Sequence, residues 1–265
     1  MIESLLAGLF GLLIGSFLNV CIYRLPRGLS VVAPRSYCPG CEKTIAWYDN
    51  IPVLSYLLLR GCCRNCGATI SWRYPLVELM TGALFVTGVA TFGLTLAAIK
   101  FCLFAAIQVV LIFSDAEERI LPDEFTLGGI LAGITFAGLV PMQSGLLALV
   151  LPHDLHWRWL SIAESALGAL FVSAVLWGVG ELYFRIRKRE GLGFGDVKMV
   201  ACIGAFVGLG GALFTVMLGS ILGSVVGLTF IYLTKKDASS YELPFGSFLA
   251  IAAILVALES AVFVL

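Results

Sequence analysis

Long uncharged stretches, separated by short charged segments, dominate the sequence. About 20 apolar residues span a bilayer as a helix, and the stretch from Leu5 to Tyr23 has that length without a charged side chain. Two later stretches, 79–114 and 199–234, are each 36 residues long, and together they contain one charged residue, Lys100. Each is too long for a single crossing, so we expect each to form two helices.

The turns inside the two double-length stretches are expected where glycines interrupt them, near 92–95 and at 208–211. Segments 125–141 and 162–184 supply one further span each, and a last span runs from Pro244 to the C-terminus. The pattern therefore predicts an all-α polytopic membrane protein with about eight transmembrane helices. The first apolar run lacks a secretory cleavage pattern and is expected to be retained.

Composition agrees with this pattern. Of 265 residues, 60% are hydrophobic and 13% charged, and the mean hydropathy is +0.99. These values are typical of a chain whose main solvent is the lipid bilayer. The formal net charge is zero, so bulk electrostatics favours no nucleic-acid partner.

The distribution of Lys and Arg predicts the orientation, because cytoplasmic loops of membrane proteins are enriched in both. With the N-terminus outside, the loops after spans one, three, five and seven carry 15 of the 17 basic residues. Only Lys100 and Arg158 then lie on the periplasmic side. We therefore expect a periplasmic N-terminus and large cytoplasmic loops.

This topology divides the chain into three parts. They are a first transmembrane helix at 1–23, a cytoplasmic loop domain at 24–75 and a seven-helix membrane domain at 76–265. Segment 143–160 becomes a periplasmic excursion, and the sequence assigns it no role. Its Trp157 and Trp159 suit a membrane interface.

The cytoplasmic loop contains two Cys-x-x-Cys pairs, Cys38 with Cys41 and Cys63 with Cys66, with 21 residues between the pairs. Such spacing can bring four thiolates around one tetrahedral zinc ion. A loop of this size buries little apolar surface, so a structural metal would supply folding energy. Disulfides or free thiols are the alternative, and a reducing cytoplasm disfavours disulfides. Cys62 is left over.

Acidic residues gather at the edges of the apolar segments. Asp196 lies in GFGDVK, just before the uncharged run 199–234, and the segment SDAEERILPDEF covers 114–125. Two carboxyl groups that meet across a helix bundle can share one proton. The ionised group can then take a proton from water while the neutral one polarises a carbonyl, which is aspartic-protease chemistry.

Two aspartates compete as the partner of Asp196. Asp115 directly follows an apolar run and should project into the bundle, whereas Asp123 follows Pro122 in a position typical of a helix N-cap. Position therefore favours Asp115. The remaining acids are expected to form a solvated face; they are Glu117, Glu118 and Glu124. Gly193 and Gly195 would allow close backbone approach beside Asp196, although a flexible connector whose aspartate caps the next helix is the alternative.

Five motifs in order resemble the type IV prepilin peptidases, a family of GxGD aspartyl proteases with N-methyltransferase activity. They are GSFLNVCIYRLP at 15–26, the double Cys-x-x-Cys loop around DNIPVLSYLLLRG at 49–61, ISWRYPLVE at 70–78, Asp115 followed by LPDEFTL, and GFGDVK at 193–198. The extra Cys62 and the long segment 143–160 depart from the family pattern.

The resemblance implies that Asp115 and Asp196 are the catalytic aspartates and that Cys38, Cys41, Cys63 and Cys66 bind the metal. It implies a multi-pass enzyme of the bacterial inner membrane whose active site faces the cytoplasm. Its substrates would be type IV prepilins and type II secretion pseudopilins, which it would cleave and then N-methylate from S-adenosylmethionine. No residue is assigned to the methyl donor; flanking polar candidates are Asn19, Arg24, Arg73 and Glu78.

Two other functions fit parts of the pattern. A processing peptidase without methyltransferase activity would share every feature except the methyl donor. A proton-coupled transporter could use Asp115 and Asp196 as a relay, but its acids should lie near the bilayer midplane and not at the edges of the apolar segments.

Overall fold

A computed structural model describes residues 2–142, 146–149, 156–189, 191–234 and 244–262. These residues form helices and loops without a strand, apart from two isolated β-bridges. The chain packs as two compact units, 1–110 and 111–265, and the division falls inside one helix. These two packing units do not coincide with the three parts predicted from membrane topology. The three-part division stays a prediction.

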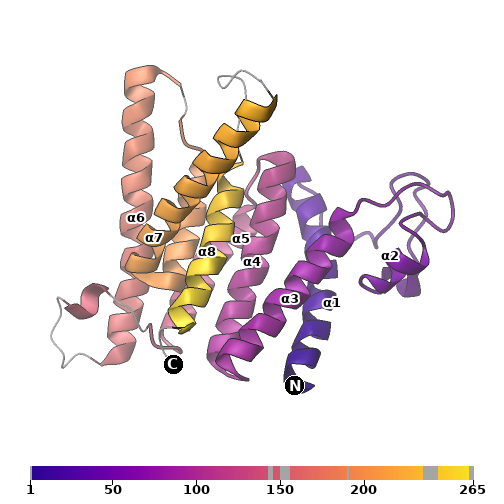
Figure 1. Ribbon diagram of the computed structural model, residues 1–265, viewed down its shortest axis with the longest axis horizontal. Helices are drawn as coiled ribbons and strands as arrows, with labels where there is room; N and C mark the ends of the chain where they lie inside the picture. The colour runs from indigo at the N-terminus through magenta and orange to yellow at the C-terminus, as the bar shows by residue number, and fades with distance from the viewer. Residues whose placement is uncertain (1, 143–145, 150–155, 190, 235–243, 263–265) are drawn as a thin grey trace. The chain divides into compact units, whose positions relative to one another are not determined.

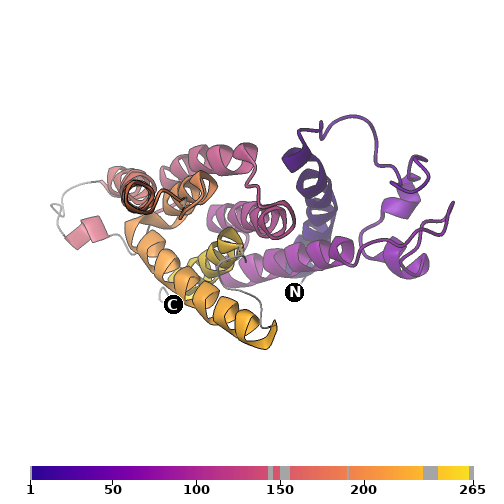
Figure 2. The same ribbon diagram turned by 90° about the horizontal axis from the view of Figure 1, so that it is seen from above.

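Seven long helices account for most of the fold (Figures 1 and 2). Five are long and apolar enough to cross a membrane; they are α1 (Ile2–Arg24), α3 (Arg73–Phe92), α4 (Leu96–Glu118), α6 (Trp157–Arg187) and α7 (Phe194–Thr234). The shorter ones are α5 (Asp123–Ala137) and α8 (Phe245–Val262). The all-α polytopic architecture is therefore confirmed for the described residues, while the count of eight crossings stays a prediction.

Glycines break both double-length stretches where the sequence predicted turns. Gly93 ends α3 with a φ of 66°, and α4 begins three residues later. Gly208 interrupts α7 with φ 77° and ψ −175°, so that α7 consists of two helical segments, 194–207 and 209–234. Both backbone conformations are accessible to glycine and strained for other residues.

In the first unit, α1 packs along α3 through small residues. A side chain at Gly11 would lie 2.8 Å from the Cα of Gly82, and one at Gly15 would lie 2.7 Å from the Cα of Glu78. Such close contact gives helices in lipid their van der Waals attraction. Seven large apolar side chains of α1 are exposed, as expected for a lipid-facing surface; they are Ile2, Leu5, Leu6, Leu9, Phe10, Leu13 and Phe17.

The loop between α1 and α3 extends sideways from the adjoining ends of these two helices (Figures 1 and 2). It contains three short helical turns, namely η1 (Leu25–Arg27), η2 (Trp47–Asn50) and α2 (Leu54–Leu58). Arg64 forms a two-point ion pair with Asp49 at 2.7 and 2.9 Å, which fixes η2 to the second cysteine pair. This guanidinium lowers the pKa of the Asp49 carboxyl.

In the second unit, α6 and α7 approach at backbone distance. A side chain at Gly204 would overlap the carbonyl oxygen of Gly168, and the Ser165 hydroxyl donates to the Ala205 carbonyl at 2.7 Å. Beside this contact, the buried Glu164 accepts a hydrogen bond from the Leu209 N–H at 3.2 Å. The same carboxylate accepts from the N–H groups of η3 (Leu146–Leu149), at Leu146 and Leu147. Glu164 thereby holds the break in α7.

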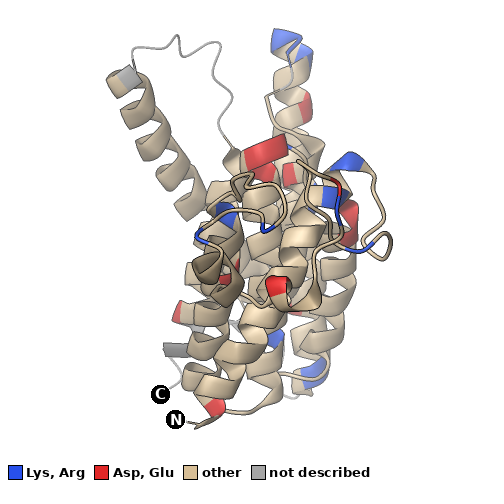
Figure 3. Cartoon of the chain, turned by 90° about the vertical axis from the view of Figure 1, so that its right-hand side faces the viewer, with Lys and Arg blue, Asp and Glu red and all other residues tan. Residues whose placement is uncertain are grey.

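The positions of the charged residues agree with the predicted apolar segments. The long helices carry few of them along their length, and most fall at helix ends and in loops (Figure 3). Glu164 is an exception that the sequence pattern passed over, since it lies inside the predicted span 162–184.

The contact between α6 and α7 can be tested with matched alanine substitutions. Gly204→Ala places a methyl group against backbone that cannot move aside, so we expect it to destabilise the protein by about 1–3 kcal/mol. Gly178→Ala, also in a helix but with open space around it, should stabilise by about 0.5–1 kcal/mol. Thermal unfolding of both purified variants in detergent measures the difference, and equal midpoints would contradict the packing described.

Candidate functional site

Asp115 lies in the last turn of α4 with only 7% of its surface exposed. Its Oδ2 accepts a hydrogen bond from the Ser247 N–H at 2.7 Å and lies 2.9 Å from the Ser247 hydroxyl. That hydroxyl is also 3.0 Å from the Ile112 carbonyl, and its single hydrogen can serve one acceptor at a time. The first turn of α8 therefore fixes the position of the Asp115 carboxylate.

Asp196 lies in the first turn of α7 and is half-buried. Its backbone N–H donates to the Gly193 carbonyl at 3.1 Å. A side chain added at Gly193 would contact Asp196 Oδ2 at 3.4 Å. The glycine thus leaves room beside the carboxyl group, as the sequence suggested.

The two carboxyl groups meet over Gly246 of α8. A Cβ at this glycine would lie 3.2 Å from Asp115 Oδ2 and also 3.2 Å from Asp196 Oδ1. Both oxygens are that close to one point, so they are at most twice that distance apart. Two oxygens within this limit are close enough for a single water molecule to bond to both groups. The structure therefore brings together the two aspartates selected from the sequence.

Asp123 has a different role. It is the first residue of α5, whose N-cap is Pro122, so the expectation that Asp123 is the N-cap was wrong. Pro122 ends the preceding loop with an extended ψ of 130°, and the Asp123 carboxylate forms an ion pair with Lys198 of the GFGDVK segment. Asp123 thus contacts the amine two residues beyond Asp196 and is absent from the surroundings of Gly246.

Gly246 and Ser247 were missed by the sequence analysis. They follow Pro244 and Phe245 in the stretch PFGS at the start of α8. A proline directly before these residues is typical of the start of a helix. The pattern gives no sign, however, that Asp115 lies opposite.

Four cysteines form a second candidate site, in the loop between α1 and α3. The sulfur atoms of Cys38, Cys41, Cys63 and Cys66 all lie within 4.8 Å of one another. Cys62 is outside this cluster and forms a β-bridge with Thr69.

The two cysteine pairs have the same backbone hydrogen-bond pattern. Cys38 N–H donates to Lys43 O, and Glu42 N–H donates back to Cys38 O. In the second pair, Cys63 N–H donates to Ala68 O and Gly67 N–H donates back to Cys63 O. The residue after each second cysteine has a positive φ, 57° at Glu42 and 71° at Gly67. Two equivalent tight turns therefore present the four thiols to one centre.

The cluster fits a tetrahedral metal ion. Zinc–sulfur bonds of about 2.3 Å require sulfur atoms about 3.8 Å apart, and Cys38 Sγ lies 3.7 Å from Cys66 Sγ. Hydrogen bonds from the backbone of Asn65 and Cys66 lower the pKa of the Cys63 thiol to about 6. A thiolate is the form that binds metal.

Two family models match consecutive parts of the chain. Residues 9–92 match the model of the bacterial Peptidase A24 N-terminal domain, and residues 102–228 match the type IV leader peptidase family. The chain is 34% identical to a prepilin leader peptidase/N-methyltransferase of Aeromonas hydrophila, over 92% of this chain and 86% of that protein. The chain belongs to the type IV leader peptidase family.

Other relatives of the same name agree. One from Myxococcus xanthus is 39% identical over 88% of this chain, although the match spans only 64% of that longer protein. One from Pseudomonas aeruginosa is 34% identical over 92% of this chain and 86% of that protein. No solved structure is significantly similar to the chain.

The polar residues considered for the methyl donor in this leader peptidase are engaged in internal contacts. Asn19 donates to Tyr74 O at 3.0 Å, and Arg24 donates to the carbonyls of Ser30 and Pro34 at 2.9 and 2.8 Å. The remaining two were Arg73, which stacks on the Tyr74 ring, and Glu78, which accepts from the Val53 N–H at 2.7 Å. Asn19, Arg24 and Glu78 thereby link α1, α3 and the loop to one another.

Substitution of single cysteines tests the metal cluster. Cys66→Ser removes one of four ligands, so we expect the purified protein to lose its metal, because three thiolates bind a tetrahedral ion far more weakly. Cys62→Ser is the matched control and should retain about one metal ion per chain. Elemental analysis gives both values. Equal metal loss in the two variants, or retention in both, would show that the clustered thiols are not the ligands.

Proposed function

We propose that the chain is a bifunctional membrane enzyme that cleaves the leader from type IV prepilins and type II secretion pseudopilins. It then methylates the new N-terminal amine with S-adenosylmethionine. The names of its relatives support both activities. The convergence of Asp115 and Asp196 over Gly246 is the structural observation that carries the peptidase activity.

In this proposal Asp115 and Asp196 are the catalytic dyad. One carboxylate accepts a proton from the water held between them while the protonated partner donates a hydrogen bond to the scissile carbonyl. The hydroxide equivalent adds to the carbonyl carbon, and the leaving amine then takes a proton from the dyad. Ser247 orients Asp115 through its N–H, so a part of the machinery comes from the first turn of α8.

The bacterial inner membrane is the proposed setting, with a periplasmic N-terminus. Eight crossings follow if α5, α8 and the two segments of α7 each span the bilayer. Asp115 is three residues from the end of α4 and Asp196 is the third residue of α7. Both aspartates therefore lie at helix ends on the cytoplasmic side, where a basic leader would leave the membrane. This position disfavours a transporter relay at the midplane.

Zinc is the proposed metal of the four-cysteine cluster. Four thiolates with no open position are typical of structural zinc. The ion would stabilise a loop that has few buried apolar residues of its own, and it would take no part in peptide cleavage.

The dyad is tested by separate Asp115→Asn and Asp196→Asn substitutions. Each removes a proton-transfer group while preserving shape, so leader cleavage should fall by about 10²–10⁴-fold. Asp123→Asn breaks only a partly exposed ion pair, and its effect should stay below about fivefold. Cleavage of a prepilin by each purified variant gives the rates. An inactive Asp123→Asn variant beside an active Asp115→Asn variant would assign the dyad differently.

Gly246→Ala is a more specific test of the geometry. The added methyl group would lie 3.1 Å from Asp115 Cγ and 3.2 Å from an oxygen of each aspartate. It should displace the carboxyl groups and the water, which lowers the cleavage rate by about 10²-fold. Gly128→Ala, where the methyl group meets no atom within 4 Å, is the control for an added methyl in a helix. Full activity of Gly246→Ala would exclude a water site over this glycine.

A further inference from the structure

A cavity of about 420 Å³ lies in the first unit, between α1 and the loop. Its walls are the α1 residues from Leu13 to Arg24 and the loop segments 31–36 and 45–52. The volume is within the range of small-molecule sites, about 300–1,000 Å³. Neither the four-cysteine cluster nor the aspartate pair contributes a residue to this wall.

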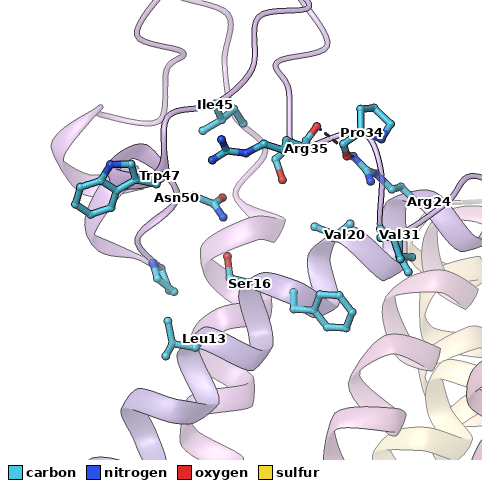
Figure 4. A pocket seen from close by; sticks show the side chains of 14 residues that line it. Leu13, Ser16, Val20, Arg24, Val31, Pro34, Arg35, Ile45, Trp47 and Asn50 are labelled. Atoms are coloured by element: carbon cyan, nitrogen blue, oxygen red, sulfur yellow. Dashed lines mark hydrogen bonds between the residues drawn. The ribbon is translucent and has the colours of Figure 1, made fainter.

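Three polar side chains from separate segments face the cavity. Figure 4 shows the Ser16 hydroxyl of α1, the Asn50 amide of η2 and the Arg35 guanidinium directed toward a common space. Trp47 and Phe17 add aromatic rings to the same lining. Arg24 also lines the cavity, but its guanidinium is occupied by the backbone carbonyls of the loop. Arg35 is therefore the guanidinium available to an anionic group of a ligand.

The backbone beside the cavity is strained. Val53 follows the lining residue Pro52 and has φ 60° and ψ −48°, a conformation that is an outlier for a β-branched residue. The buried Glu78 holds it there by accepting the Val53 N–H at 2.7 Å, and the same carboxylate interacts with the Ser16 hydroxyl. Such strain persists only where surrounding structure enforces it, and it is concentrated at ligand sites. Glu78 thus lies behind the lining, where it contacts Ser16 and fixes the backbone that follows Pro52.

We infer that this cavity is the binding site for the methyl donor, S-adenosylmethionine. The inference rests on the proposed methyltransferase function and names its site. The donor set fits the chemistry of the ligand: Arg35 suits the carboxylate, an aromatic ring such as Trp47 suits the adenine, and the oxygens of Ser16 and Asn50 suit the sulfonium cation. Of the two arginines in the lining, Arg24 is held by the loop carbonyls, so Arg35 alone is left to pair with the ligand carboxylate.

The position of the cavity suits the methyl acceptor. Its lower wall is Leu13, Ser16 and Phe17, inside a helix apolar enough to cross a membrane, and its upper wall is loop. The new N-terminus of a pilin is the amine at the end of a membrane-embedded helix, so it emerges at the same boundary. The neutral amine's lone pair forms the N–C bond as the C–S bond breaks, which leaves a neutral thioether. The proton lost by the methylated ammonium goes to water.

Direct measurement of donor binding tests the inference without relying on turnover. The full chain in detergent is dialysed against radiolabelled S-adenosylmethionine. We expect Arg35→Gln and Asn50→Leu each to weaken binding by about tenfold or more. Lys43→Gln removes the same charge from the same loop but lies outside the cavity lining, and it should bind like the unchanged protein. Thermal unfolding midpoints verify that the exposed Arg35 and Asn50 positions tolerate substitution.

The outcomes separate this inference from the function on which it rests. If the unchanged protein methylates a cleaved pilin and both cavity variants bind the donor normally, the cavity is the wrong site while the function stands. If the unchanged protein cleaves the leader but neither binds the donor nor transfers a methyl group, the methyltransferase function fails, and the inference fails with it. Loss of binding in Lys43→Gln equal to that in Arg35→Gln would indicate a general charge effect and would also overturn it.

Discussion

The fold of the second unit depends on how two carboxyl groups can share a small space at the edge of an apolar bundle. Like charges a few ångströms apart repel, and burial makes each charge more costly. The structure meets both constraints with the first turn of α8. Gly246 contributes no side chain, so both groups can approach one point, and the Ser247 N–H donates a hydrogen bond to Asp115. A larger residue at position 246 would keep the two carboxyl groups apart. Without the hydrogen bond from Ser247, the Asp115 carboxylate would be more costly to bury.

The position of Asp196 depends in turn on the rigidity of α7. Its first segment, 194–207, is fixed against α6 by the backbone contact between Gly204 and Gly168. Beyond the break, the N–H of Leu209 would be unsatisfied in an apolar environment without the Glu164 carboxylate. A buried acid of α6 therefore permits the break that ends this segment, and the segment presents Asp196 at its other end. The two buried acids Glu164 and Asp115 serve different purposes, one structural and one proposed as catalytic.

Local chemistry explains which features could be predicted from the sequence. The turns at Gly93 and Gly208 and the two cysteine turns depend on residues that are neighbours in the chain, and these predictions agree with the structure. Asp115 and Asp196 could be selected because each adjoins a long apolar run. Contacts between distant segments left no local pattern: Ser247 is 132 residues from Asp115, and Lys198 is 75 residues from Asp123.

The expectations for Asp123 and Glu164 failed because they too depend on contacts between distant segments. Asp123 has the local pattern of an N-cap, but Pro122 occupies that position and the Asp123 carboxylate pairs with the distant Lys198 instead. Glu164 was included in an apolar span because a single acid hardly alters the mean hydropathy of a long helix. Its three backbone donors come from two other segments, which only the folded chain brings near. Three of the polar residues considered for the methyl donor likewise contact other segments, which the local sequence could not show; they are Asn19, Arg24 and Glu78.

Chemistry imposes an order on the two proposed activities. The nitrogen of a peptide bond is not nucleophilic, because its lone pair is delocalised into the carbonyl. Hydrolysis at the aspartate pair converts this nitrogen into an amine, and only then can it attack a methyl group. The acceptor for the second reaction is thus the product of the first, still attached to a helix in the bilayer. In the proposed topology both reactions occur at the cytoplasmic face, so the product needs only to move along the membrane surface. The short path of the product between the two sites favours one chain with both activities over two separate enzymes.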